Sequence, residues 1–454
     1  MQAVAQDLIA SSEHRVVVGL GVTGLSCARH LYRQGASFSV VDTREHPPGL
    51  EQLQLEMPEV PVYAGSCPED LLASASELVV SPGIALDEPL IAGAIGAGAK
   101  VVGDIDLFVR EAKAPVIGIT GSNAKSTVTE LVGAMAKQAA LNVGVGGNLG
   151  IPALDLLADD RELYVLELSS FQLERAGKLE LAVATVLNLS ADHLDRHGSM
   201  PRYHQAKHRI FFGCAKAVCN SDDPLTIPLL EDSVPVIRWR LGEPDLNGFG
   251  LREEGGELFL SHGFDCLLAV KNLPIAGRHN QANALAALAL GYAAGLPMGA
   301  MVKALLDFRG LPHRCERVME SAGVCFVNDS KGTNIGATEA ALVGLGGQRD
   351  IVLIAGGQGK GADFRQLRKS VEQHCRHLVL IGEDALALEA ALADVVTIGH
   401  AANMTEAVSA AIAVAKQGDT VLLSPACASF DMFSGYAARG DAFKAAVREQ
   451  GGEQ

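Results

Sequence analysis

Basic residues are scarce in this chain. It has 37 lysines and arginines against 53 aspartates and glutamates, and its formal net charge is −16 over 454 residues. A general nucleic-acid binder needs clustered lysines and arginines to contact the phosphates. We therefore expect no nucleic-acid partner. Any anionic ligand must be held by a few local cations and by backbone N–H groups.

Signals for secretion, disulfide pairing and membrane insertion are also missing. The nine cysteines contain no C-x-x-C pair, and residues 1–15 lack a charged start followed by an apolar core. No run of about eighteen apolar residues is free of polar breaks, and the alanine-rich region 282–306 predicts a pair of buried helices. These absences predict reduced thiols and a cytoplasmic protein without a membrane partner. We expect it to be a monomer.

Short valine-rich runs alternate with helical patterns along most of the chain. Such runs predict buried parallel strands, and their alternation with helices predicts an α/β protein. At about 150 residues per domain, the length predicts three domains, which we place at residues 1–103, 104–311 and 312–454. Each should have a mostly parallel sheet flanked by helices, Rossmann-like in the first and last domains and of the P-loop type in the central one. The predicted strands are RVVVGL, FSVVD, VPVYA, ELVVS, PVIGIT, LYVLEL, AVATVLN, VCFVND, DIVLIAG, HLVLIG and DTVLLS.

The segment GITGSNAKSTVTELV, residues 118–132, resembles a phosphate-binding loop between a strand and a helix. The N-terminus of such a helix offers free N–H groups to a phosphate. Lys125 would reach the β- and γ-phosphates, and the Ser126 hydroxyl would bind Mg²⁺. The match is imperfect because Ile119 and Ala124 stand where the strict pattern has glycine, and an ordinary strand–helix turn is the alternative. The candidate ATP-binding loop comprises Gly121, Ser122, Asn123, Ala124, Lys125, Ser126 and Thr127.

The backbone conformation of Ala124 decides what this departure costs. At positive φ, alanine is on the order of 1 kcal/mol less favourable than glycine. We predict a negative, helical φ at Ala124, because alanine is a good helix former and would be tolerated there. The loop should then be functional.

Candidate metal ligands follow two other apolar strands. Glu167 ends the strand in LYVLEL, and Asp192 and His193 lie just beyond AVATVLN. Open α/β sheets bind ligands at the carboxyl ends of their strands. Histidines spaced by four in NLSADHLDRH and YHQAKHRI raise the possibility of zinc, but no cysteine or glutamate completes a zinc set and H-E-x-x-H is absent. A Mg²⁺–nucleotide site fits better; a helix-capping role is the alternative for Glu167.

The first domain carries a dinucleotide-binding fingerprint. Gly19, Gly21 and Gly24 form G-x-G-x-x-G after a strand, and Asp42 follows at the distance expected for an acid that binds ribose. Alone, this pattern predicts NAD and an oxidoreductase. A lone fingerprint is weak evidence, and the pyrophosphate of a different nucleotide would bind equally well at the helix N-terminus.

Three polar loops follow strands of the last domain: NDSKGTN, GGQGKGADF and SPACASF. Because all three lie at carboxyl ends of strands, they can converge on one side of one sheet. Their lysines and hydroxyl groups would suit a dicarboxylate ligand. Ordinary glycine-rich turns are the alternative.

Together these motifs resemble those of the Mur ligases, which build the stem peptide of bacterial peptidoglycan. The resemblance covers nearly the whole chain. VVGLGVTGLS, VDTREHPPGL and SPACASFDMF make it most similar to the family members that add D-glutamate. The motifs occur in the family's order: GITGSNAKST, LELSSFQLE, NLSADHLDRH with YHQAKHRI, GRHNQANALAA, LPHRCE, NDSKGTN and SPACASFDMF.

The resemblance implies an ATP-dependent ligase that joins D-glutamate to UDP-N-acetylmuramoyl-L-alanine through an acyl phosphate. It implies ATP and two Mg²⁺ ions, and a carbamylated lysine at Lys207, to which the sequence alone assigns only a surface position. The implied catalytic residues are Lys125, His193, Lys207 and Arg314. The implied ATP-binding residues are those of the loop together with Asn280, Asn283, Arg314 and Asp329. The implied metal ligands are Ser126, Glu167, His193 and carbamylated Lys207.

The resemblance assigns the UDP-muramoyl substrate mainly to the first domain and D-glutamate to the last. The implied UDP-muramoyl contacts are Val22, Thr23, Asp42, Arg44, Ser81, Gly83 and Asn148. The implied D-glutamate contacts are Lys331, Thr333, Lys360, Ser429 and Tyr436, the last of which departs from the family in residue type. The alternatives are another Mur-type or folylpolyglutamate-type ligase, an NAD-dependent oxidoreductase, and a nucleotide-binding regulator whose catalysis Ala124 has abolished.

Overall fold

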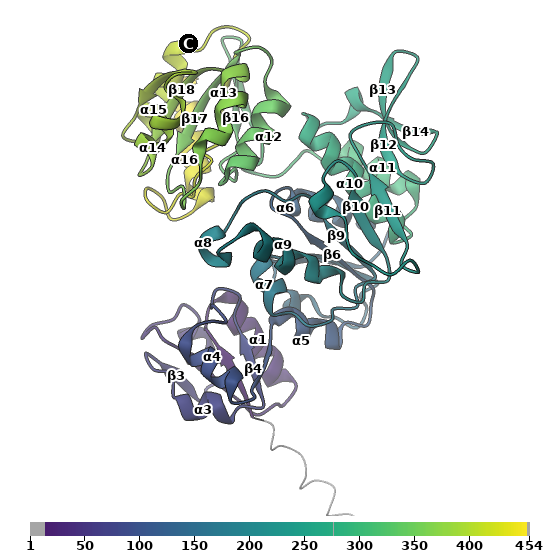
Figure 1. Ribbon diagram of the computed structural model, residues 1–454, viewed down its shortest axis with the longest axis vertical. Helices are drawn as coiled ribbons and strands as arrows, with labels where there is room; N and C mark the ends of the chain where they lie inside the picture. The colour runs from purple at the N-terminus through teal and green to yellow at the C-terminus, as the bar shows by residue number, and fades with distance from the viewer. Residues whose placement is uncertain (1–13, 276, 452–454) are drawn as a thin grey trace, which may run out of the picture.

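A computed structural model describes residues 14–275 and 277–451. It contains three sheets that follow one another along the chain, each flanked by helices (Figure 1). The predicted α/β class is confirmed. In Figure 1 the middle domain lies between the N-terminal domain, drawn in purple, and the C-terminal domain, drawn in green and yellow.

The N-terminal sheet has five parallel strands in the order β3-β2-β1-β4-β5. Strand β2 is buried along its whole length, as expected for a valine-rich strand covered on both faces. The chain changes direction across the sheet between β1 and β4, which is where such sheets form a ligand crevice. The strands are β1 Arg15–Val18, β2 Phe38–Asp42, β3 Val62–Ala64, β4 Glu77–Val80 and β5 Lys100–Val102, and the helices are α1 Val22–Arg33, α2 Leu50–Glu56, α3 Glu69–Ser74 and α4 Pro89–Gly96.

The middle sheet has nine strands in the order β14-β13-β12-β11-β10-β9-β6-β8-β7. Its strands are parallel from β7 to β12, and an antiparallel ribbon of β12, β13 and β14 extends one edge. The ribbon was not among the predicted strands, because charged residues interrupt its apolar runs. The strands are β6 Val116–Thr120, β7 Val143–Gly147, β8 Leu163–Glu167, β9 Val183–Val186, β10 Ala217–Asn220, β11 Val236–Trp239, β12 Phe249–Glu254, β13 Glu257–His262 and β14 Asp265–Ala269.

The helices of the middle domain run from α5 to α11. The predicted pair of helices in the alanine-rich region is confirmed, because α10 and α11 pack into one core with α6. The helices are α5 Asp104–Glu111, α6 Lys125–Gln138, α7 Ser170–Arg175, α8 Leu194–His197, α9 Met200–His208, α10 Arg278–Ala293 and α11 Met298–Asp307.

The C-terminal sheet has six strands in the order β15-β16-β20-β17-β18-β19, and only β15 runs antiparallel to its neighbour. Strand β17 is buried throughout. The strands are β15 Glu316–Ser321, β16 Val324–Asn328, β17 Ile351–Gly356, β18 Cys375–Ile381, β19 Thr397–His400 and β20 Thr420–Leu423, and the helices are α12 Ile335–Leu345, α13 Arg368–His374, α14 Ala385–Leu392, α15 Met404–Val414 and α16 Tyr436–Gly451.

No helix within the described residues combines the length and the apolar character that a membrane crossing requires.

Candidate active site

The predicted phosphate loop joins the end of β6 to the start of α6, so the predicted strand–loop–helix arrangement is confirmed. Lys125 is the first residue of α6. Its Nζ folds back over the loop and donates to the carbonyl oxygens of Gly121 at 2.9 Å and Ser122 at 3.0 Å. Burial lowers the pKa of Lys125, although the carboxylate of Glu167 opposes the shift.

The prediction of a negative φ at Ala124 is wrong. Ala124 has φ 69° and ψ −9°, in the left-handed region, and it precedes α6 instead of belonging to its first turn. The prediction failed because it extended the helix by one residue. The loop reverses direction before the helix begins, and that reversal needs the conformation in which alanine is on the order of 1 kcal/mol less favourable than glycine.

Glu167, at the end of β8, forms the centre of an oxygen-rich cluster beside the loop. Its Oε2 accepts from the Ser126 hydroxyl at 2.5 Å, and its Oε1 accepts from Nδ2 of Asn148 at 2.7 Å. Arg314 donates to the same Ser126 hydroxyl at 2.5 Å. Burial raises the pKa of Glu167, but Lys125, Ser126 and Asn148 together outweigh it and lower the pKa. An ionised carboxylate next to a hydroxyl at the end of a phosphate loop is a donor set that suits Mg²⁺.

Lys207 is buried and does not occupy the surface position that its sequence context indicated. Its side chain rises from α9, and Nζ donates to the Gly121 carbonyl at 2.9 Å and to the Thr120 hydroxyl at 3.3 Å. The centre of the Tyr203 ring lies 4.8 Å from Nζ of Lys207. Burial, reinforced by Lys125, lowers the pKa of Lys207 well below its usual value. A buried amine of this kind is neutral more often than a surface lysine.

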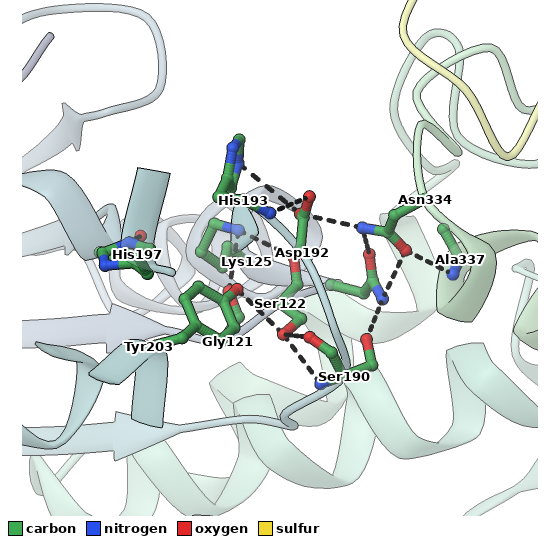
Figure 2. A network of polar contacts seen from close by, with 12 residues as sticks. Gly121, Ser122, Lys125, Ser190, Asp192, His193, His197, Tyr203, Asn334 and Ala337 are labelled. Atoms are coloured by element: carbon green, nitrogen blue, oxygen red, sulfur yellow. Dashed lines mark hydrogen bonds and ion pairs between the residues drawn. The ribbon is translucent and has the colours of Figure 1, made fainter. Parts of the chain in front are cut away.

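Asp192 and His193 lie just before α8, opposite the loop (Figure 2). His193 has φ 53°, and its backbone N–H donates to Asp192 Oδ1 at 2.9 Å. Its Nε2 lies 3.6 Å from Asp192 Oδ2. Burial lowers the pKa of His193, and Lys360, Lys125 and Lys207 add to the shift. A neutral imidazole is the form that binds a metal. Within the described residues, no group of three or more His, Cys, Asp or Glu side chains is arranged to hold a metal ion.

A cavity of about 790 Å³ lies beside the loop and is lined by residues of both the middle and the C-terminal domains. Asp329 lies in its wall, where burial raises the pKa of the carboxyl group to about 6. Trp239 at the end of β11 and the first turns of α12 form other parts of the wall. The predicted ATP-binding residues that line it are Asn123, Ala124, Thr127, Asn280, Asn283, Arg314 and Asp329.

A second cavity, of about 670 Å³, occupies the crevice of the N-terminal sheet. The Asp42 carboxylate accepts from the Leu20 backbone N–H at 2.7 Å and from Nη2 of Arg44 at 2.6 Å. Arg44 is the main reason that the pKa of Asp42 falls to about 2. Six of the seven predicted UDP-muramoyl contacts line this cavity, and Asn148 instead lies on Glu167: the six are Val22, Thr23, Asp42, Arg44, Ser81 and Gly83.

The three polar loops of the C-terminal domain converge, as predicted. The guanidinium of Arg439, a buried residue of α16, donates to oxygens of Ser330, Gly356, Cys427 and Ala428 and so joins all three loops. Of the predicted D-glutamate contacts, Lys331 has its Nζ 3.8 Å from the centre of the Tyr436 ring. Burial lowers the pKa of Lys331 to about 8. Lys360 is exposed, Thr333 is half-buried and Ser429 is buried.

Sequence reasoning missed three residues that organise this region: Arg175, Asn334 and Arg439. Each is a single polar residue within a helical or loop pattern, and its partners are distant in the sequence. Arg175 contacts the N-terminal domain, Asn334 contacts the phosphate loop, and Arg439 joins the loops of its own domain. Asn334 ends the predicted polar loop NDSKGTN, but no spacing in the sequence indicates the roles of these three residues, because only the folded chain brings their partners together.

Family models and known proteins match this chain over nearly its whole length. The Mur ligase MurD-like N-terminal domain matches residues 13–103, the Mur ligase middle domain matches residues 119–291, and the Mur ligase glutamate ligase domain matches residues 313–427. The UDP-N-acetylmuramoylalanine–D-glutamate ligase of Pseudomonas aeruginosa is 55% identical over 445 residues, covering 98% of this chain and 99% of that protein. The protein of the same name from Nitrosococcus oceani is 53% identical over 435 residues, covering 96% of each.

Solved structures with low sequence identity share the fold. A pseudomurein peptide ligase type C from Methanothermus fervidus superposes with a TM-score of 0.60 at 20% identity, over 90% of this chain and 96% of that one. The MurF ligase of Thermotoga maritima, solved in complex with ADP, gives a TM-score of 0.58 at 17% identity, over 96% of each chain. The matches of all three domains and the full-length relatives lead to one conclusion: this chain belongs to the Mur ligase family.

Proposed function

We propose that this protein joins D-glutamate to UDP-N-acetylmuramoyl-L-alanine in peptidoglycan precursor synthesis, with conversion of ATP to ADP and phosphate. The observation that carries the proposal is the cluster of Lys125, Ser126, Glu167 and Arg314 at the edge of a nucleotide-sized cavity. Relatives that cover the whole chain at more than half identity carry the name of this activity. We propose the cytoplasm as its compartment.

The first step transfers the γ-phosphoryl group of ATP to the carboxylate of the alanyl substrate. Such a transfer needs positioning and neutralisation of charge, and no protein nucleophile takes part. Lys125 and Arg314 supply fixed positive charge beside the loop, and the remaining loop residues contribute N–H groups. Asn280, Asn283 and Asp329 hold the nucleoside from the walls of the cavity. Ser126 and Glu167 would hold one Mg²⁺ ion, which neutralises phosphate charge when bound.

The second step forms the amide bond. The amine of D-glutamate attacks the acyl carbon, inorganic phosphate leaves, and the amine gives up a proton. In this proposal Lys331, Thr333, Lys360, Ser429 and Tyr436 hold the carboxylates of D-glutamate. The C-terminal domain must stay against the middle domain during this step, because water would otherwise hydrolyse the acyl phosphate.

We propose that Lys207 is carbamylated. Its amine is buried with a lowered pKa, and a neutral amine is the form that adds to carbon dioxide. The product would be an oxygen ligand near His193 for a second Mg²⁺ ion. Intact-protein mass spectrometry under carbon dioxide, after trapping of the carbamate by alkylation, should show the modification in the wild type and not in Lys207→Met. Equal labelling of both proteins would contradict the assignment.

We also propose the remaining substrate contacts that the family resemblance implies. Val22, Thr23, Asp42, Arg44, Ser81 and Gly83 would bind the UDP-muramoyl substrate in the N-terminal cavity, and Asn148 would act through Glu167. The corresponding domain division is residues 1–103, 104–311 and 312–454. The cluster around the phosphate loop favours this assignment over an NAD-dependent activity, which gives that loop no role.

The decisive experiment measures phosphate release from ATP with Mg²⁺, bicarbonate, the muramoyl-alanine nucleotide and one amino acid at a time. We expect release only when both the nucleotide and D-glutamate are present. Release with a different amino acid would keep the ligase mechanism and overturn the substrate. Binding of ATP without release under every condition would favour a regulator that has lost catalysis.

A further inference from the structure

The C-terminal domain reaches the phosphate loop through the start of α12. Gly336, in the first turn, lies so close to the middle domain that a Cβ atom there would be 2.7 Å from the Ser190 hydroxyl. At the other end of the helix, a Cβ atom on Gly344 would clash with the ring of His279. Glycine at both ends therefore lets α12 lie against the middle domain.

Asn334, the residue that caps α12, uses its side-chain amide completely (Figure 2). Its Oδ1 accepts from the Ala337 backbone N–H at 2.9 Å and from Asn123 Nδ2 at 3.3 Å. Its Nδ2 donates to Asn123 Oδ1 at 3.1 Å and to Asp192 Oδ2 at 3.1 Å. A primary amide has two donor hydrogens and two acceptor lone pairs. The N–H of Ala337 and the carboxylate of Asp192 fix which side of the amide is oxygen and which is nitrogen.

The partners of Asn334 in the middle domain lie in two segments, the phosphate loop and the residues just before α8. Asn123 lies within the phosphate loop, where its backbone N–H donates to Asn188 Oδ1 at 2.8 Å and its carbonyl accepts from Asn188 Nδ2 at 3.1 Å. Asp192 precedes His193. A shift of the loop on nucleotide binding therefore changes the contacts of Asn334, and a movement of the C-terminal domain changes the position of Asn123.

We propose that Asn334 is a positioning residue that links the conformation of the phosphate loop to the docking of the C-terminal domain. This inference rests on the proposed function, because domain docking serves to let D-glutamate capture the acyl phosphate before water reaches it. Asn334 forms or breaks no covalent bond. It keeps α12, and with it the loop that carries Lys331 and Thr333, beside the phosphate loop.

Two substitutions separate this role from the capping of α12. Asn334→Asp and Asn334→Ser both retain an oxygen that can cap the helix, because Asp and Ser are good N-cap residues. Asp has no N–H to donate and would face the carboxylate of Asp192, and Ser is too short to reach Asn123. Asn403→Ser is the matched control. Asn403 caps α15 in the same domain through the Glu406 N–H, and within the described residues its side chain forms hydrogen bonds with Glu406 only.

The first measurement asks whether phosphate release stays coupled to amide formation. We expect Asn334→Asp and Asn334→Ser to raise KM for D-glutamate about tenfold, the equivalent of one or two lost hydrogen bonds, and to release more phosphate than amide. KM for the muramoyl nucleotide and the thermal midpoint should match those of Asn403→Ser. Equal amounts of phosphate and amide with an unchanged KM for D-glutamate would overturn the proposal.

The second readout does not depend on activity, so it separates failure of this proposal from failure of the proposed function. Small-angle X-ray scattering with Mg²⁺ and a non-hydrolysable ATP analogue gives the radius of gyration. We expect both Asn334 variants to be more extended than the wild type and Asn403→Ser. If all four proteins share one radius of gyration, Asn334 does not control docking, whatever reaction the enzyme catalyses.

Discussion

At the scale of single residues, backbone geometry and the burial of charge lower the free energy of unfolding in ways that the sequence does not reveal. Ala124 adopts a left-handed conformation in the phosphate loop, and Asp104 at the start of α5 is buried with a carboxyl pKa of about 6. Both features weaken the fold, and each can be tested by one substitution.

Ala124→Gly should increase the free energy of unfolding by on the order of 1 kcal/mol, because glycine adopts positive φ without strain. Chemical denaturation measures the change. Ala140→Gly is the matched control, since Ala140 has φ 63° just beyond the same helix and outside the loop. Both variants should be stabilised, and KM for ATP should change only in Ala124→Gly. Stabilisation of the control alone would mean that Ala124 is not strained.

Asp104→Asn should stabilise the protein at pH 7.5 and less so at pH 5. Burial raises the folded-state pKa of Asp104 from 3.8 to about 6, with Gln172 and Arg175 opposing the shift. The folded protein therefore binds this proton more tightly than the unfolded chain, and stability is lost as pH rises from 3.8 through 6. Burying the new amide has its own cost, so we expect the free energy of unfolding to increase by about 1 kcal/mol at pH 7.5. Denaturation at both pH values measures it; a gain independent of pH would contradict the explanation.

At the scale of elements, α7 ties the N-terminal cavity to the middle domain. The Arg175 guanidinium is fully buried and donates to the carbonyls of Val80, Ser81, Pro82 and Ile84, and Nε donates to that of Phe171. The Ser81 hydroxyl in turn donates to the Gly19 carbonyl at 2.9 Å. One arginine thus fixes the loop that forms a wall of the second cavity.

Arg175→Lys should raise KM for the muramoyl nucleotide about tenfold, because lysine has three donors where arginine has five. KM for ATP should stay within about twofold of the wild-type value, since Arg175 does not line the nucleotide cavity. Steady-state kinetics with each substrate varied in turn measures both constants. Arg161→Lys is the control, because the Arg161 contacts lie within the middle domain. Equal effects on both KM values would indicate general destabilisation.

The elements themselves were largely predictable and the contacts between domains were not. Valine-rich runs such as FSVVD and DIVLIAG predicted strands correctly because both faces of a parallel strand are buried, so the apolar run is continuous. The ribbon of β12, β13 and β14 has one solvated side and a mixed composition, so it gave no such run. The candidate site residues came from motifs. Asn334 ends the quoted motif NDSKGTN and Arg175 follows LELSSFQLE, but the sequence assigned neither of them a role, because each role depends on partners more than 90 residues away.

At the scale of the whole molecule, the domains are joined unequally. Buried hydrogen bonds from Arg175 of α7 to the carbonyl oxygens of residues 80–84 fix the N-terminal domain to the middle domain. The C-terminal domain contacts the phosphate loop through Asn334 and Arg314 and shares the walls of the nucleotide cavity. Movement during catalysis is therefore expected between the middle and C-terminal domains.

Nucleotide binding should stabilise these two domains together. A ligand present at 100 times its dissociation constant adds about 2.7 kcal/mol to the stability of the state that binds it. Because the cavity wall comes from both domains, we expect calorimetry with a non-hydrolysable ATP analogue and Mg²⁺ to show one merged transition at higher temperature. A transition of the C-terminal domain that stays unchanged would show that it contributes no binding energy.

The wall of the nucleotide cavity also gives the protein an intrinsic optical probe. Trp239 is the only tryptophan in the chain, and it lies in that wall. Excited selectively, its indole emits from one known place, so a nucleotide titration should change the emission without any attached dye, and Trp239→Phe should abolish the signal. Arrival and departure of the nucleotide can then be timed in a stopped-flow instrument, separately from the chemistry that follows.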